Sequence, residues 1–357
     1  MLTEERREAL LRLVERRGAV KVTELAAAMG VSAVTLRQDV RDLAGRGLVV
    51  RVHGGVMSPA AARRAEVAAP AVATAPAGGH HVLGLVVPPG GYYYPEIIRG
   101  VQEAARTHGV RVVLAVSAET LAANQEQVRR LVGSGVDGLL LMPRAGLEPA
   151  DEADEWLDGL DVPVVLLDRR TGARAGRLEQ VAADHPYGAG LAVRHLAGLG
   201  HGRIALVVRA MSPNTPLIRE GYTEACRDLG LAAGPEFRID TTDESAACDE
   251  EFAAFLALVG AGEVRAALVH NDLDAVALVG LARARGLRVP EDLAVVSYDD
   301  EVAELSDVPL TAVAPPKRAV GGWAVDLLMR RLADPTPPLA EVLLRPELRV
   351  RASTRPA

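Results

Sequence analysis

The sequence predicts an α/β protein with a small helix-turn-helix unit and a β wing at its N-terminus, followed by two lobes built on parallel sheets. Three observations lead to this expectation. A helix-turn-helix pattern ending in a β-branched run occupies residues 19–57, an Ala/Pro-rich segment fills 58–80, and apolar runs alternate with amphipathic helices from Val82 onward. The composition, with 49% hydrophobic but only 3% aromatic residues, suits the aliphatic strands of buried parallel sheets.

Caps and apolar spacing define two helices within residues 19–57. Thr23 is placed to cap the first helix, Gly30 supplies the turn that follows it, and Ser32 can cap the second helix. In the second helix an i, i+4, i+7 apolar row predicts the residues that face the core. These core-facing residues are Leu36, Val40 and Leu43.

The opposite face of the second helix is polar and basic. The rotation of a helix turns Val34, Arg37, Gln38 and Arg41 outward, and such a face suits the base edges and phosphates of double-stranded DNA. An ordinary solvated helix face is the alternative. The agreement of turn, caps and spacing favours DNA binding.

A short strand and a glycine pair follow the second helix. Gly47 ends that helix, and Leu48 to Val52 run as a β-branched strand into His53-Gly54-Gly55. The run SAVTLRQDVRDLAGRGLVVRVHGGV resembles the DeoR-type winged helix-turn-helix, with Gln38 where that family usually has a second arginine. The resemblance implies operator binding, with one altered contact at Gln38. The DNA-contacting residues that we expect are Ser32, Val34, Thr35, Arg37, Gln38, Arg41, Arg51 and His53.

The net charge is distributed unevenly along the chain. Residues 1–58 hold ten basic and seven acidic residues, a charge of +3, so the rest of the 357-residue chain carries −10 of the total of −7. Basic residues are therefore concentrated where DNA contact is expected.

The remaining composition points to the cytoplasm. Two cysteines, Cys226 and Cys248, indicate incidental thiols and not a disulfide framework or a metal site. The charged N-terminus lacks the apolar run of a signal peptide, and no stretch approaches the 18 apolar residues of a membrane span. We expect a cytoplasmic protein without membrane contact.

Repeated strand-helix units occupy the rest of the chain. Their spacing of about 25–30 residues predicts βαβ units and parallel sheets in two consecutive lobes, with ligands binding at the carboxyl ends of the strands. In the first series the expected strands are 82–88, 110–117, 136–143 and 162–168, with helices at 95–108, 120–133 and 150–158. In the second series the expected strands are 181–185, 203–208, 237–239, 266–270 and 293–299, with helices up to 199 and at 217–229, 246–259, 272–285 and 317–332.

Residues 82–355 resemble the sensor domain of LacI/GalR repressors, a periplasmic-binding-protein-like fold. The segments that carry the resemblance are GLAVRHLAGLGHGRIALV, REGYTEACRDLGL, VHNDLDAVALVGLARARGLRVPEDLAVVSYDDEVAEL and PLTAVAPPKRAVGGWAVDLLMRRL. It implies a homodimer that binds a small molecule, usually a sugar or a purine, between its two lobes. Repression of carbohydrate-related genes, relieved by a sugar, is the commonest mode of control that it implies. It does not extend to the DNA-binding headpiece and hinge helix of that family.

Polar residues at strand ends are the candidate ligands for this effector. Arg219 stands where the family places an arginine that forks hydrogen bonds to a sugar, Asp299 matches the family's cleft aspartate, and Asn271 can donate and accept. Several have competing roles, because Arg219 could be a surface residue, Asp272 a helix cap, Asp168 and Arg169 an ion pair, and the tyrosines a packed loop. The full set is Tyr92, Tyr94, Asp168, Arg169, Arg219, Asn271, Asp272 and Asp299.

The sequence lacks the motifs of an enzyme. His195 and His201 stand in a structural helix and turn, and we find no phosphate loop, HExxH, GxSxG or paired cysteine ligands. No cofactor, metal or catalytic residue is expected. A transporter's solute-binding protein and a sugar-phosphate enzyme are the rival readings, and the winged helix argues against the first. The expected domains are the winged helix at 1–57, the linker at 58–80 and the sensor at 81–357.

Overall fold

The computed structural model describes the second half of the chain almost completely and the N-terminal part only in places. The described residues are 10–11, 14, 19–21, 40, 43, 49–52, 55–57, 81–89, 91–117, 120–142, 156–157, 159–168, 178–239 and 246–355. The chain divides into two compact units, residues 1–74 and 75–357, and the division falls within the Ala/Pro-rich segment. No helix of the described residues is long and apolar enough to cross a membrane.

The N-terminal unit contains a small antiparallel sheet. β1 (Ala19–Lys21), β3 (Gly55–Met57) and β2 (Val50–Val52) pair in the order β1-β3-β2, and Val52 stands opposite Gly55 in the β2–β3 hairpin. The predicted β wing is therefore confirmed. The helical residues Val40 and Leu43 are buried as the spacing predicted, together with Leu10, Val14 and Val49.

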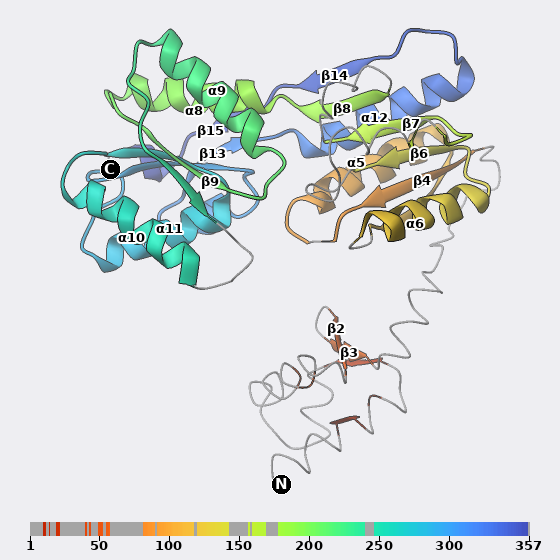
Figure 1. Cartoon of the computed structure of the whole chain (residues 1–357), viewed down its shortest axis with the longest axis horizontal. Helices are drawn as coiled ribbons and strands as arrows, with labels where there is room; N and C mark the ends of the chain where they lie inside the picture. Colours follow the sequence, from red (N-terminus) through yellow and green to blue (C-terminus); the bar gives the residue numbers. More distant parts are fainter. Residues whose placement is uncertain are drawn as a thin grey trace. The chain divides into compact units, whose positions relative to one another are not determined.

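The first lobe of the larger unit is a six-stranded parallel sheet in the order β14-β8-β7-β6-β4-β5. Figure 1 shows its helices α5, α6 and α12 beside these strands. The strands are β4 (Val82–Val87), β5 (Arg111–Val116), β6 (Gly138–Leu141), β7 (Val164–Leu167), β8 (Glu179–Ala183) and β14 (Glu341–Leu344). The helices are α5 (Tyr94–His108), α6 (Leu121–Gly133) and α12 (Lys317–Ala333).

The second lobe has a six-stranded sheet in the order β10-β9-β11-β12-β13-β15, which is parallel except for β15. Its strands are β9 (Ala205–Arg209), β10 (Glu236–Ile239), β11 (Ala266–Val269), β12 (Ala294–Tyr298), β13 (Thr311–Ala314) and β15 (Glu347–Arg349). Its helices are α8 (His185–Gly198), α9 (Thr215–Asp228), α10 (Ala246–Gly260) and α11 (Asp272–Ala284), with short 3-10 turns η2 (Ala303–Leu305) and η3 (Ala352–Thr354).

The two lobes are not consecutive in sequence. The chain passes between the sheets three times, after β8, after β13 and after β14. The expectation that residues 181–185 and 317–332 belong to the second lobe is wrong, because β8 pairs with β7 and β14, and α12 packs into the core of the first lobe. The predicted strands at 82–88, 110–117 and 203–208 match β4, β5 and β9 closely.

Helices α5 and α12 of the first lobe contact each other backbone to backbone. A Cβ added at Gly100 would lie 1.9 Å from the carbonyl oxygen of Arg318, and one at Gly321 would lie 2.1 Å from that of Ile97. Only glycine permits this approach. The contact places the N-terminal end of α12, with Lys317, against the first lobe.

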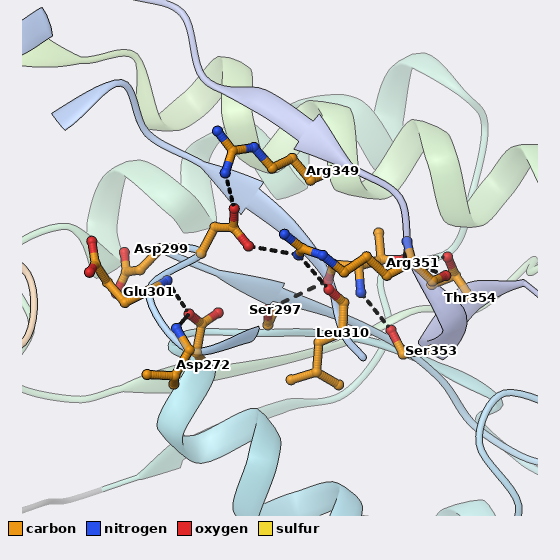
Figure 2. Close-up of polar contacts among 12 residues, drawn as sticks. Asp272, Ser297, Asp299, Glu301, Leu310, Arg349, Arg351, Ser353 and Thr354 are labelled. Atoms are coloured by element: carbon orange, nitrogen blue, oxygen red, sulfur yellow. Dashed lines mark hydrogen bonds and ion pairs between the residues drawn. The ribbon is translucent and has the colours of Figure 1, made fainter. Parts of the chain in front are cut away.

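The C-terminal segment is hydrogen-bonded into the second lobe. The buried Ser353 hydroxyl accepts from the Thr311 backbone N–H at 2.8 Å and donates to the Val295 carbonyl at 2.6 Å. Figure 2 shows Ser353 and Arg351 beside these strands, where Arg351 donates to the carbonyl of Leu310 at 2.8 Å. The C-terminal segment thereby supplies partners to polar groups in the core of the sheet.

Ser353→Ala is expected to lower the free energy of unfolding by about 1–3 kcal/mol, because it leaves a buried N–H and a buried carbonyl without this partner. Urea denaturation followed by circular dichroism measures the change. Thr336→Ala, which removes a hydroxyl bonded at the surface to Asp334, is the control and should change the midpoint little. Equal midpoints for the two variants would contradict the assigned role of Ser353.

Candidate functional site

A cavity of about 250 Å³ lies between the carboxyl ends of strands from both lobes. The loops after β4 and β7 supply its first-lobe wall, and those after β9, β11 and β12 supply the second. Parallel strands present their carboxyl ends at one edge of a sheet, so polar residues just past these ends gather there. The lining residues are Tyr92, Tyr93, Tyr94, Asp168, Arg209, Met211, Ser212, Pro213, Asn214, His270, Asn271 and Asp299.

Five of the predicted ligand residues line this cavity: Tyr92, Tyr94, Asp168, Asn271 and Asp299. They come from four different strand ends, which the sequence placed correctly. Arg169 lies outside the described residues.

Arg219 does not line the cavity, contrary to the expectation. Its guanidinium forms two hydrogen bonds with the carboxylate of Glu236 on β10, at 2.8 and 2.7 Å. These bonds raise the pKa of Arg219 and lower that of Glu236. The surface reading of Arg219 is therefore the correct one.

The cavity's arginine is Arg209, which the sequence reasoning missed. It is the last residue of β9, and its guanidinium binds both carboxylate oxygens of Asp274 at 2.6 and 2.9 Å. Arg209 directly follows the predicted strand 203–208 in the sequence, and this position is the signal that identifies it. Asp168 and Asn271 are predicted from the same kind of position.

Asp272 is buried and does not line the cavity. One of its carboxylate oxygens accepts from the backbone N–H groups of Glu301 and Val302, at 2.6 and 3.1 Å, as Figure 2 shows for Glu301. The cap of α11 is Asn271, whose side-chain oxygen accepts from the N–H of Leu273 at 3.2 Å. Asp272 is thus neither the expected cap nor a lining residue, and it holds the loop after β12.

Two aspartates of the cavity have left-handed backbone conformations. Asp168 has φ 54° and Asp299 has φ 96°, and both follow buried strands. Such conformations are costly for residues other than glycine and are concentrated at functional sites. Each turns the chain sharply where its carboxylate faces the cavity.

Lys317 connects both walls of the site. Its Nζ donates to the carbonyl oxygen of Asp299, lies 2.7 Å from the Glu301 carboxylate and stands 5.2 Å from the centre of the Tyr93 ring. The Tyr93 hydroxyl in turn donates to Asp168 at 3.2 Å. A single cation of α12 therefore contacts residues of the two lobes.

Burial dominates the electrostatics of the cavity. It raises the pKa of Asp299 to about 8, opposed by Lys317 and reinforced by the carboxylates of Asp272, Asp168 and Glu301. Burial also lowers the pKa of His270 to about 3, with further lowering by His185 and Arg209. Burial thus disfavours charge on both groups.

Several buried polar atoms in the cavity lining or close to it lack a hydrogen-bond partner among the described residues. They are the Tyr92 hydroxyl, Nδ1 of His270 and Oδ1 of Asp272. Burial, followed by the nearby charges of Asp299 and Asp272, raises the pKa of Tyr92. Polar groups left in this state are usually satisfied by a ligand or by water.

A larger cavity of about 570 Å³ lies at the crossings of the chain between the lobes. Its charged side chains are mostly paired, since Asp300 binds Arg349 at 2.6 Å and Lys317 binds Glu301. Arg345 stacks 4.9 Å from the ring centre of Tyr187. The smaller cavity, with its unsatisfied polar atoms, is therefore the better candidate for a ligand site.

Of the predicted DNA contacts, Arg51 lies within the described residues. Arg51 belongs to strand β2, and only its backbone is described. Outside the described residues lie Ser32, Val34, Thr35, Arg37, Gln38, Arg41 and His53.

Comparison with known domain families separates the chain into the same two parts. Residues 6–61 match the DeoR-like helix-turn-helix domain, and residues 193–354 match a periplasmic binding protein-like domain. The expected winged helix-turn-helix and the expected sensor fold are both confirmed.

Individual relatives cover most of the larger unit. The transcriptional regulator CelR of Thermobifida fusca is 33% identical over 270 residues, which are 73% of this chain and 76% of the relative. A LacI family transcriptional regulator from Mycobacterium smegmatis has a solved structure that is 31% identical, covers 77% of this chain and 99% of its own, and gives a TM-score of 0.64.

A solved complex of a CelR regulator with cellobiose is similar over a longer range. It is 29% identical to this chain, covers 94% of it and 99% of the solved chain, and gives a TM-score of 0.65. These similarities confirm the expected transcriptional regulator. The chain belongs to the LacI family of transcriptional regulators.

Proposed function

We propose that this regulator reads operator DNA through a DeoR-type winged helix and binds a polyhydroxylated, sugar-like effector in the cavity between its sensor lobes. It acts as a cytoplasmic homodimer and a repressor of carbohydrate-related genes, without enzymatic activity. The observation that carries the proposal is the cavity between strand ends, with its buried polar atoms. The cellobiose complex of the related CelR regulator supports a sugar-like effector.

The lining residues have the chemistry for hydroxyl recognition. Asp168 and Asp299 accept hydrogen bonds from hydroxyl groups, Asn271 both donates and accepts, and the Tyr92 ring offers an apolar face to a sugar ring. Arg169 is proposed as a further contact at the first-lobe wall. Arg219 and Asp272 are not included, because neither lines the cavity.

A ligand in this cavity would couple the lobes. It would contact residues of both walls at once, and the chain links the lobes through three short crossings. A ligand shifts such an equilibrium only through its preference for one lobe arrangement. Closure would then change the geometry of the dimer and its affinity for operator DNA.

Arg37→Ala and Arg41→Ala are each expected to weaken operator binding by about 10- to 100-fold, since each removes one arginine contact to DNA. Fluorescence anisotropy with a labelled operator fragment measures this change. Effector binding should stay at the wild-type level in both variants. Operator affinity that remains unchanged in both would remove the assignment of the recognition helix.

Tyr92→Phe is expected to weaken effector binding by about 5- to 10-fold, because it removes one neutral hydrogen bond to the ligand. It should also raise the melting temperature of the unliganded protein, since a buried hydroxyl without a partner is lost. A thermal-shift screen with mono- and disaccharides, sugar phosphates and nucleosides identifies the ligand, and calorimetry gives the affinities. Tyr187→Phe, outside the cavity lining, is the control. No stabilisation by any compound class would contradict the proposed effector site.

The unliganded protein is expected to lose stability as the pH rises from about 7 to about 8. The folded chain holds a proton on Asp299 up to a pKa of about 8, whereas the unfolded chain releases it near 4. Stability therefore falls with pH between these values. His270 has the opposite effect only below about pH 6.5, where the unfolded histidine takes up a proton.

Urea denaturation at several pH values measures this dependence. Asp299→Asn should flatten it by about 1 kcal/mol between pH 7 and 8. The same substitution at the exposed Asp307 should leave the wild-type slope. If the free energy of unfolding of Asp299→Asn still falls with pH as in the wild type, the proton that is released between pH 7 and 8 belongs to another group.

A further inference from the structure

The carboxyl group of Asp299 is buried at the cavity, and no cation among the described residues forms an ion pair with it. The residue is 4% exposed and lines the cavity, and its side-chain oxygens make no hydrogen bond or ion pair with the described residues. Lys317 lies beside it and its charge favours ionisation of Asp299, but its ammonium group is bound by the Asp299 backbone carbonyl and, at 2.7 Å, by the Glu301 carboxylate. A buried carboxylate in this state is costly until a cation or several donors reach it.

The arginine of the lining does not supply that cation. Arg209 holds Asp274 through two hydrogen bonds of 2.6 and 2.9 Å, and this pairing fixes its guanidinium plane. Asp272 adds a further carboxylate close to Asp299, and its Oδ1 has no hydrogen-bond partner among the described residues. Carboxyl groups therefore outnumber cations around Asp299, and the nearby cations Arg209 and Lys317 already have carboxylate partners.

The first-lobe wall also suits a cation. Tyr92, Tyr93 and Tyr94 all line the cavity, and the Tyr93 ring already faces the ammonium of Lys317 at 5.2 Å. Aromatic faces attract ammonium groups, most strongly where water is displaced. A positively charged group between the tyrosines and Asp299 would gain from both walls.

We propose that the effector is a polyhydroxylated molecule bearing a protonated amine, an amino sugar or a related aminopolyol, whose ammonium group pairs with Asp299. This inference rests on the proposed function, because it assigns the chemical class of the effector at the same cavity. The hydroxyl groups of the ligand are then available to Tyr92, His270 and Asn271. A neutral sugar brings no cation to favour ionisation of the buried Asp299 carboxyl group, and an anionic sugar opposes that ionisation further.

Matched sugar pairs test the inference on the full chain. Isothermal titration calorimetry compares D-glucosamine with D-glucose, D-galactosamine with D-galactose and D-mannosamine with D-mannose, at a pH where the amines are protonated. N-acetyl-D-glucosamine keeps the nitrogen without the charge, and glucosamine 6-phosphate adds an anion. The expected result is that at least one amine binds about tenfold or more tightly than its neutral partner and its N-acetyl form.

Two variants test whether the preference for the amine comes from an ion pair with Asp299 or from the loss of any carboxylate. Asp299→Asn should reduce the preference for the amine to about twofold, because it removes the paired charge and retains the shape. Asp307→Asn makes the same change at a side chain that is 85% exposed and should keep the full preference. An amine preference that survives in Asp299→Asn would overturn the assigned pairing.

The remaining outcomes of the titrations distinguish failure of the amine assignment from failure of the proposed effector site. Neutral sugars that bind as tightly as every amine, or a phosphate that binds more tightly, overturn the amine assignment and leave the polyhydroxylated effector in place. The absence of binding by any member of the panel overturns the amine assignment and contradicts the proposed effector site as well.

Discussion

The buried ammonium group of Lys317 holds the two walls of the cavity in their observed relation. It belongs to α12, which packs into the core of the first lobe, yet it binds the Asp299 carbonyl and the Glu301 carboxylate of the second. Its charge also faces Tyr93, which is hydrogen-bonded to Asp168. Lys317 begins α12 directly after the second chain crossing, so these contacts between the lobes lie next to a connection between them.

Hydrogen bonds and ion pairs hold the loops and side chains around the cavity, while some of its buried polar groups have no partner among the described residues. Asp274 holds Arg209, and Asp272 holds the loop after β12 through two backbone N–H groups. On this frame Asp168 and Asp299 adopt left-handed backbone conformations, and the buried Asp299 side chain has no hydrogen-bond partner in the part of the chain that the structure describes. Strain and desolvation of this kind lower the stability of the folded protein, and they persist where a ligand recovers the lost energy.

Most of the site could be predicted from strand ends, because a polar residue directly after an apolar run must lie at the edge of a parallel sheet. That rule placed Asp168, Asn271 and Asp299. It could not decide the partner of a side chain, and so Arg219 was assigned to the ligand although Glu236, seventeen residues away, binds it. Periodicity likewise locates a strand or a helix without naming its sheet. Residues 181–185 and 317–332 were therefore assigned to the wrong lobe, and the three crossings were not foreseen.

Two of the three crossings lie close to Asp299. The second crossing ends at Lys317, and the first begins after β8 and leads into α8 at His185, whose Nδ1 lies 3.1 Å from the hydroxyl of Tyr298. Tyr298 is the residue directly before Asp299 at the end of β12. A ligand that changes the charge environment of Asp299 thus acts on the loop that contacts two of the three connections between the lobes.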